Sequence, residues 1–145
     1  TIANQLALYL TMYSPLQMAA DFPEHYEQFA DAFQFIKDVA VDWQKSKYLL
    51  AEPGDYIVVA RKAKKTGKWF AGGVTDENSR TLDVPMNFLE PGKTYVAKIY
   101  ADAADADYQK NPQAYVINEQ EVTSESVLPI FMARGGGFAI EFSEK

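Results

Sequence analysis

The stretch that decides the fold of this chain is Asp55-Tyr56-Ile57-Val58-Val59-Ala60-Arg61. Its β-branched residues are typical of a β-strand. Gly67 marks a turn into a second strand-like run, residues 68–75, and Pro91-Gly92 marks another turn. Strands joined by short turns predict an antiparallel β-sandwich or barrel. The remaining runs of this type are residues 80–84, 94–100, 115–123, 126–131 and 138–142.

The first 38 residues follow a different pattern. Residues 1–13 read as a helix, and Ser14-Pro15 ends it. Residues 15–21 predict a short buried strand, and residues 24–37 a second helix with apolar side chains at helical spacing. Helix, strand and helix in succession are typical of an α/β unit. We therefore expect a mixed fold: a short α/β segment, residues 1–38, a linker, residues 39–47, and an antiparallel all-β sandwich, residues 48–145.

The composition excludes several classes of function. A net charge of -6 does not favour a nucleic-acid surface, which needs clustered Lys and Arg. The absence of Cys removes disulfides, thiolate catalysis and zinc-thiolate sites. His25 is the only histidine, so neither a histidine-based metal site nor a Ser-His-Asp site is expected. No apolar run approaches the roughly 20 residues of a membrane-spanning helix.

The helix predicted for residues 1–13 is apolar almost all round, with one stripe formed by Ile2, Leu6, Tyr9 and Tyr13. Such a helix is built to be covered on several sides. We therefore expect the chain to be the carboxy-terminal part of a larger protein. If it consists of these residues alone, we expect it to self-associate through residues 1–13, because soluble monomers rarely expose large apolar patches.

Two groups of residues admit both a functional and a structural interpretation. Asp102, Asp105 and Asp107 have oxygen ligands suited to Ca²⁺, but they lack the glycine and bidentate glutamate of a calcium loop, which favours a solvated acidic loop. The aromatic residues of the strands could stack on sugars, but core packing is the default for alternating strands; they are Trp69, Phe70, Tyr95, Tyr100 and Tyr115.

The glycines and arginines of the strands favour structural roles. Gly135 to Gly137 precede a strand, so they suit a turn or a close backbone approach and not a phosphate loop. Gly72-Gly73 inside a strand suggests a bulge or a tight contact. Arg61 and Arg80 are expected to pair with acidic residues, for which Asp55, Asp76 and Asp83 are the candidates.

Several stretches together resemble glycoside hydrolase family 97, a family of α-glucosidases and α-galactosidases. The most specific is Tyr13-Ser14-Pro15-Leu16-Gln17-Met18-Ala19-Ala20-Asp21, followed by Pro23. The other stretches are residues 5–9, 33–39, 42–43, 54–56, 60–61, 88–89, 100–102 and 135–140, with Trp69, Gly73 and Arg80.

This resemblance implies a parent enzyme that hydrolyses α-glycosidic bonds of oligosaccharides in the bacterial periplasm or outside the cell. It implies that residues 1–38 are the last helix, strand and helix of a (β/α)₈ barrel, and that the β-sandwich is mainly structural. It also implies that Ca²⁺ and the catalytic glutamates belong to earlier barrel strands. Because glycoside hydrolysis needs two carboxylates about 5 to 9.5 Å apart across one bond, we expect no catalytic residue, cofactor or metal in this chain and no activity from it alone.

The resemblance leaves one set of site residues here. Asp21 ends the predicted strand of residues 15–21, and strand ends form the active-site face of such barrels. Asp21, Glu24 and Tyr26 are thus candidates for the rim of the substrate pocket. The alternative is that Asp21 caps the following turn through nearby N–H groups. The alternative for the whole chain is a stand-alone carbohydrate-binding or interaction module.

Overall fold

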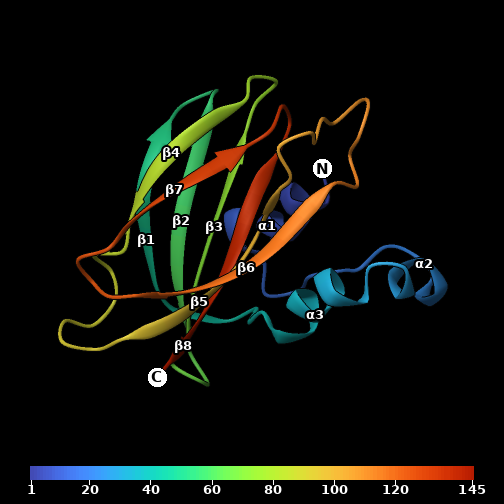
Figure 1. The fold of residues 1–145 in the computed structure, drawn as a ribbon. Coiled ribbons are helices and arrows are strands. Elements are labelled where there is room, and N and C mark those ends of the chain that lie inside the picture. The colour runs from blue at the N-terminus through green and yellow to red at the C-terminus, as the bar shows by residue number, and fades with distance from the viewer.

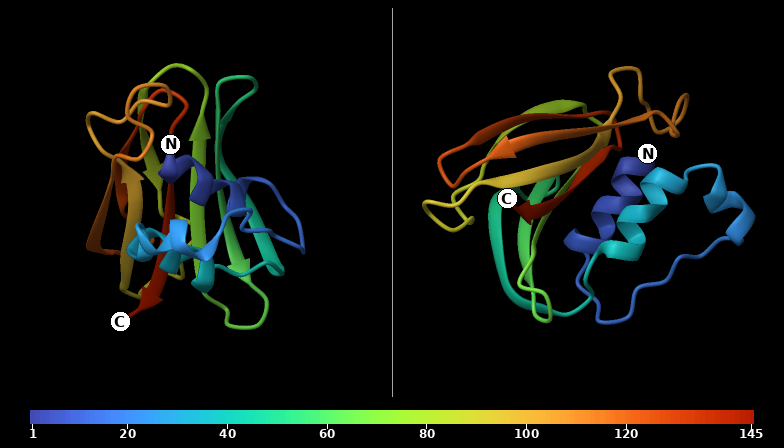
Figure 2. Two further views of the ribbon diagram at one scale, coloured as in Figure 1. Left: turned by 90° about the vertical axis from the view of Figure 1, so that its right-hand side faces the viewer. Right: turned by 60° about the horizontal axis from the view of Figure 1, so that its bottom comes forward.

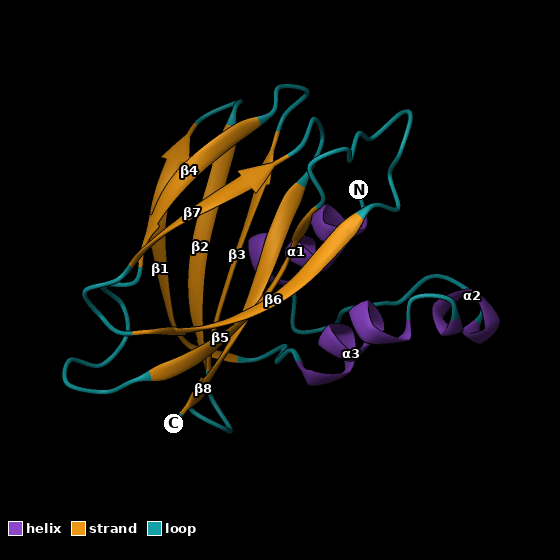
Figure 3. Cartoon of the chain, viewed as in Figure 1, coloured by secondary structure: helices purple, strands orange, loops and turns teal.

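The computed structural model describes all residues from Thr1 to Lys145. Three helices precede eight strands (Figures 1 and 3). The helices are α1 (Ile2–Thr11), α2 (Pro23–Glu27) and α3 (Ala30–Asp38). The strands are β1 (Trp43–Glu52), β2 (Tyr56–Ala63), β3 (Trp69–Thr75), β4 (Arg80–Pro85), β5 (Tyr95–Asp102), β6 (Tyr115–Val122), β7 (Val127–Met132) and β8 (Gly137–Glu144).

The strands form two antiparallel sheets, as the period-two pattern predicts. The larger sheet has six strands in the order β1-β2-β3-β8-β5-β6, and the smaller consists of β4 and β7. Figure 1 shows β4 and β7 in front of the large sheet, α1 behind it, and α2 and α3 beside it at the lower right. The last strand, β8, therefore lies in the middle of the large sheet, between β3 and β5.

Successive side chains along each strand of the large sheet point to opposite faces, so the sheet has a separate hydrophobic core on each face. Trp69 of β3 faces the small sheet and packs 5.1 Å from Phe88, measured between ring centroids. Phe70, its neighbour, faces the helices and lies 6.2 Å from Phe35 of α3. Both aromatic side chains are buried, because this sheet is covered on both faces.

Helix α1 lies against the centre of the large sheet (Figure 2). Its buried face is Ala3, Leu6, Ala7 and Leu10, at the spacing of one helical stripe. This differs from the predicted stripe, since Ile2 and Tyr9 are only partly buried at its flank.

The glycines of β3 allow this close approach. A Cβ atom added at Gly72 would lie 2.9 Å from Cδ1 of Leu10, and one at Gly73 would lie 2.6 Å from Cε1 of Phe138. The ladders on both sides of these glycines run without a register shift. Of the two alternatives predicted for Gly72-Gly73, the structure has the tight contact. Register shifts occur instead in β1, between Trp43 and Lys45 and between Tyr48 and Leu50.

Three details of the first half differ from the prediction. Residues 15–21 form no strand, because no neighbouring strand offers them ladder hydrogen bonds, and the Leu16 N–H bonds to the Ser14 hydroxyl instead. The helix expected over residues 24–37 is two helices, broken where Phe29 leaves helical geometry and packs against Tyr115. Strand β1 already begins at Trp43, inside the expected linker of residues 39–47.

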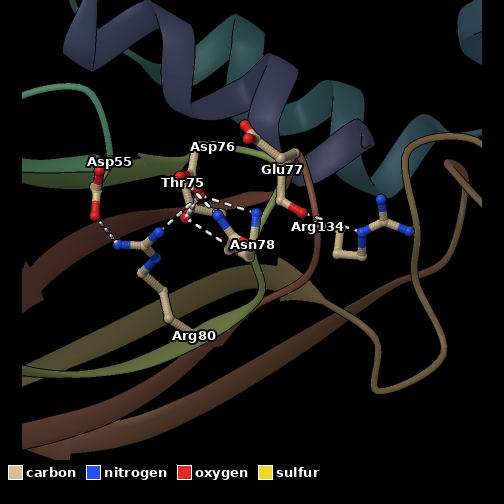
Figure 4. Close-up of polar contacts among 7 residues, drawn as sticks. All are labelled: Asp55, Thr75, Asp76, Glu77, Asn78, Arg80 and Arg134. Carbon is tan, nitrogen blue, oxygen red and sulfur yellow. Dashed lines mark hydrogen bonds and ion pairs between the residues drawn. The ribbon is translucent and has the colours of Figure 1, made fainter.

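A polar cluster ties together the turns at one end of the sandwich (Figure 4). Arg80 donates to Asp76 at 2.7 Å and lies 3.5 Å from a carboxylate oxygen of Asp55. The same Asp76 accepts from the Asn78 N–H at 2.9 Å, and this bond together with the Arg80 charge holds the pKa of Asp76 below its usual value. The expected pairing of Arg80 with nearby acidic residues is confirmed.

Candidate functional site

A groove lies on the helical side of the molecule. It is bounded by α1, the segment of residues 12–22, α2 and α3, and its volume is about 870 Å³. Most of its lining is apolar, and the charged or titratable side chains that reach it include Asp21, His25 and Tyr26.

Residues 12–22, which we call the apolar segment, form one wall of this groove. Tyr9 of α1 donates its hydroxyl hydrogen to the Met18 carbonyl at 3.3 Å, and the Gln17 amide donates to the Met12 carbonyl at 3.1 Å. The large apolar side chains of the segment nevertheless project into solvent, with Met18 76% exposed. The exposed set is Met12, Tyr13, Leu16, Met18 and Phe22. An apolar surface of this kind marks an interaction site in a soluble protein.

The three residues predicted to form the rim of the substrate pocket do not all line the groove. Asp21 and Tyr26 both line the groove, whereas Glu24 is exposed and does not line it. The Asp21 carboxylate accepts from the Phe22 N–H at 2.8 Å and from Nδ1 of His25 at 2.6 Å. These two bonds hold the pKa of Asp21 below its usual value. The alternative that Asp21 bonds nearby N–H groups is therefore seen directly, and its place on a substrate rim stays a prediction.

Helix α3, which lines part of the groove, is fastened to the edge strand β6. The Tyr115 hydroxyl donates to the Asp31 carboxylate at 2.5 Å. Burial raises the pKa of Tyr115, and the Asp31 carboxylate raises it further, to about 12. The same hydrogen bond lowers the pKa of Asp31. The contact fixes α3 relative to the large sheet.

Arg61 is buried without a carboxylate partner, so the pairing expected for it is wrong. Its Nε donates to the Leu10 carbonyl at 2.6 Å, and Nη1 donates to the Ser46 hydroxyl at 2.6 Å. The Leu10 carbonyl belongs to the last turn of α1, where unpaired carbonyls carry partial negative charge. Arg61 of β2 therefore caps α1, and the helix end replaces the missing anion.

Asp102 is buried, so it is not part of a solvated acidic loop. Its Oδ2 accepts from the N–H groups of Ala133 at 2.9 Å and Gly137 at 2.8 Å. Gly136 passes so close that an added Cβ would lie 1.9 Å from this oxygen. The carboxylate thus organises the turn between β7 and β8, which includes Gly135 at φ +61°.

The same turn receives the first residues of α1. The Asn4 side-chain amide donates to the Gly136 carbonyl at 3.0 Å. The glycine-rich stretch therefore serves close backbone approach, as predicted.

The acidic loop does not suit a calcium ion. Asp102 is committed to backbone N–H groups, while Asp107 accepts from the N–H groups of Gln109 and Lys110. No group of three or more acidic or histidine side chains in the chain is arranged to hold a metal ion.

The strand aromatics do not form a sugar-stacking surface. Four of the five candidates are buried, and Tyr115 is partly buried and holds α3. No helix has both the length and the hydropathy needed to cross a membrane.

Sequence reasoning missed the roles of Arg61 and Asp102. One signal was available for Asp102. It lies two residues after Tyr100 in the same strand, so both side chains are on the same face of the sheet, and Tyr100 faces the helices. No sequence signal pointed to Arg61 as a helix cap, because the carbonyl that it binds lies 51 residues away.

Comparison with known proteins identifies the domain. The family model described as glycosyl-hydrolase 97 C-terminal, oligomerisation, matches residues 42–143. The chain is 33% identical over 141 residues to a retaining alpha-galactosidase of Bacteroides thetaiotaomicron, covering 97% of this chain and 20% of that protein. It is 28% identical over 137 residues to a probable retaining alpha-galactosidase of Streptomyces bingchenggensis, and this match covers 94% of this chain and 20% of that protein.

A solved structure agrees over the whole chain. A glycoside hydrolase family 97 enzyme from Pseudoalteromonas sp. strain K8, in complex with acarbose, superposes with a TM-score of 0.97 at 46% identity. The superposition covers 100% of this chain and 23% of that enzyme. The chain thus spans about a fifth of the length of the curated relatives that it matches. These matches, together with the sandwich and its helices, show that the chain belongs to glycoside hydrolase family 97, as the carboxy-terminal part of its members.

Proposed function

We propose that this chain is the supporting carboxy-terminal part of a retaining α-glycosidase that hydrolyses α-linked oligosaccharides. Its role is structural: the sandwich carries α1 and α3, and these present the groove and the apolar segment to the rest of the polypeptide. The catalytic glutamates belong to that remaining part. The names of the two curated relatives favour an α-galactoside as substrate.

The observation that carries this proposal is the apolar segment. Leu16, Met18 and Phe22 are each more than two thirds exposed. A conformation nearly the same occurs within an enzyme of which this chain covers 23%. Burial of three such side chains contributes on the order of 1.5–3 kcal/mol each. The segment therefore supports a docking role toward a larger barrel domain.

The alternative of a stand-alone carbohydrate-binding module is not favoured. Such a module needs exposed aromatic faces, and the side chains of Trp69, Phe70, Tyr95 and Tyr100 lie in the two cores. Isothermal titration with malto-oligosaccharides at millimolar concentration is expected to give no heat with this chain.

Two further parts of the proposal concern the whole enzyme. A calcium ion would bind outside this chain, because the carboxylates here are committed elsewhere. Activity of the longer polypeptide should fall on dialysis against EDTA and return with Ca²⁺, while the unfolding midpoint of the present chain should not change. We also place the enzyme in the periplasm or outside the cell, which cell fractionation followed by activity assay would test.

The main experiment compares the 145-residue chain with a longer polypeptide that includes the barrel. Hydrolysis of p-nitrophenyl α-galactoside and α-glucoside is measured for both. We expect activity only from the longer polypeptide. Hydrolysis by this chain alone at enzyme-like rates, or none by the longer polypeptide on either substrate, would overturn the proposal.

A pair of variants of the longer polypeptide tests the docking role. Met18→Glu places a charge on the apolar segment and should lower both activity and the unfolding midpoint. Tyr48→Glu changes a side chain of similar exposure on β1, 69% against 76% for Met18, and serves as the matched control. Equal effects of the two substitutions would contradict docking through the apolar segment.

A further inference from the structure

Arg61 contacts the chain on both sides of the point where α1 ends. Its Nε donates to the Leu10 carbonyl, in the last turn of α1, at 2.6 Å. Its guanidinium carbon lies 5.5 Å from the ring centroid of Tyr13, the second residue of the apolar segment. A guanidinium within about 6 Å of an aromatic ring is attracted to the face of that ring. One buried side chain of β2 therefore holds both the end of the helix and the beginning of the apolar segment.

The large sheet fixes the position of Arg61 itself. In the ladder, Arg61 lies opposite Ser46 of β1 on one side and opposite Phe70 of β3 on the other. Nη1 donates to the Ser46 hydroxyl at 2.6 Å. Because a guanidinium is planar and presents its donors at fixed angles, two bonds to acceptors on different elements orient it. The side chain of Arg61 is thus a fixed link from the sheet to the junction between α1 and the apolar segment.

The apolar segment has no hydrogen bond to the sandwich. Its bonds run within the segment and to the helices, for example from Gln17 to Met12 and from Tyr9 of α1 to Met18. Figure 2 shows the chain leaving the end of α1 and running away from the large sheet to α2. The direction in which the segment leaves the sandwich therefore depends on how the end of α1 is held.

We propose that Arg61 is a positioning residue for glycoside hydrolysis by the longer polypeptide. This inference rests on the proposed docking of the apolar segment. Arg61 sets the direction in which the segment leaves α1, and the segment carries Asp21 along the groove and presents apolar side chains to the rest of the enzyme. A misplacement of about 1 Å far from the reacting atoms can slow an enzyme about a hundredfold. Loss of the Arg61 contacts should therefore reach the reaction.

A role as a helix cap alone predicts a different result. Loss of a cap lowers the stability of the domain and the fraction of enzyme that is folded. A smaller folded fraction lowers the apparent kcat and leaves KM unchanged. A change in the position of the apolar segment alters the folded enzyme itself. Kinetic constants expressed per folded molecule, with KM and kcat separated, therefore distinguish the two roles.

The test uses the longer polypeptide and three variants. Arg61→Met removes both hydrogen bonds and the charge and keeps an unbranched side chain in the site. Tyr13→Leu removes the aromatic ring and leaves the bonds of Arg61 to α1 and β1 in place, so the helix cap is kept. Val84→Ala is the matched control, because it removes two methyl groups from the core between the two sheets, on the opposite side of the large sheet from α1.

Two measurements are made on each variant at a temperature at which circular dichroism shows that it is folded. The first is the rate of chymotrypsin cleavage after Leu16, a site within the apolar segment that none of the substitutions changes. Cleavage of a native protein follows the fraction of molecules in which the segment is open. The second is kcat and KM for p-nitrophenyl α-galactoside and α-glucoside, per folded molecule.

We expect Arg61→Met to speed cleavage after Leu16 by about tenfold or more, which is the effect of losing a hydrogen bond to a charged group. It should also lower kcat/KM by about tenfold, with part of the loss in KM. Tyr13→Leu should change both measurements in the same direction by about two- to fivefold, the equivalent of one cation–π contact. Val84→Ala should leave both within about twofold of the wild type, because it is remote from the segment.

Three results would overturn the proposal. They are an Arg61→Met cleavage rate equal to that of the wild type, changes in Val84→Ala as large as those in Arg61→Met, and a Tyr13→Leu variant that equals the wild type in both measurements. If Arg61→Met does not fold, Tyr13→Leu decides the question. Hydrolysis of neither substrate by the wild type would refute the proposed activity, and the cleavage rates would then decide separately whether Arg61 holds the apolar segment.

Discussion

Replacement of Asp102 should be among the most destabilising polar substitutions in this domain. Asp102→Ala leaves the buried N–H groups of Ala133 and Gly137 without an acceptor. Each unpaired buried donor costs about 1–3 kcal/mol, so the free energy of unfolding should fall by about 2–6 kcal/mol. The turn between β7 and β8 loses its organising group, and the seat of α1 should loosen with it.

Asp102→Asn separates hydrogen bonding from charge. The amide oxygen can keep both N–H bonds at the position of Oδ2, so only the charge contribution to those bonds is lost. The other carboxylate oxygen, Oδ1, is buried without a partner, and removal of the charge relieves that desolvation cost. We therefore expect Asp102→Asn to cost clearly less than Asp102→Ala.

Guanidinium chloride unfolding, followed by tryptophan fluorescence and circular dichroism, measures these differences. Asp105→Ala is the control, because Asp105 is exposed on the adjoining loop and its loss should change stability by no more than about 0.5 kcal/mol. An Asp102→Ala cost below about 1 kcal/mol at unchanged m-value would refute the reasoning. So would an Asp102→Asn cost equal to that of Asp102→Ala.

Three further substitutions probe the contacts of the helices. Gly72→Ala should cost about 1–3 kcal/mol by pressing on Leu10. Because Leu10→Ala removes Cδ1, the nearest obstructing atom, the double variant should cost less than the sum of the single variants. Additive effects in a denaturant double-mutant cycle would argue against the clash. Arg61→Met should cost about 1.5–3 kcal/mol by leaving the last turn of α1 uncapped, and an unchanged unfolding midpoint would exclude the cap. The pKa of Asp31 is lowered in the folded state, so the stability that Asp31 contributes is present above about pH 4, the unfolded value, and is lost as the pH falls through the folded pKa. The pKa of Tyr115 is raised to about 12 in the folded state, so the stability that Tyr115 contributes is present below about pH 10 and is lost as the pH rises toward 12. Tyr115→Phe should flatten both limbs of the stability profile measured from pH 2 to 12, and a profile identical to that of the wild type would contradict the link.

Strand content could be predicted from the sequence, because alternation and turn residues are local signals. The period of two from Tyr56 onward predicts β2 to β8, and Gly67 and Gly92 mark turns at positive φ, whereas β1, Trp43–Glu52, was not among the predicted strands. The pairing order could not be predicted in the same way. The place of β8 in the centre of the large sheet depends on contacts with β3 and β5, which no short window of sequence contains.

The errors arose where the surroundings decide the outcome. Leu16 and Met18 have the alternation of a strand, but a strand needs a neighbour, and residues 15–21 have none within this chain. Asp102 looks like a member of an acidic loop in sequence, and only the fold brings Ala133 and Gly137 against it. The candidate rim was predicted from the family resemblance, and the structure places Asp21 and Tyr26, but not Glu24, along one groove.

The central position of β8 has a consequence for how this domain folds. Gly137–Glu144 follows all the other strands along this chain, yet it joins β1-β2-β3 to β5-β6, so the large sheet consists of two unconnected halves until β8 pairs with both neighbours. Without β8, α1 lacks half of the surface on which it packs, and Leu6 and Leu10 are left partly uncovered. Local unfolding of β8 would therefore divide the sheet, whereas loss of the edge strand β6 would not. Because long-range pairing is intrinsically slow, the docking of β8 should limit the rate at which this domain becomes compact.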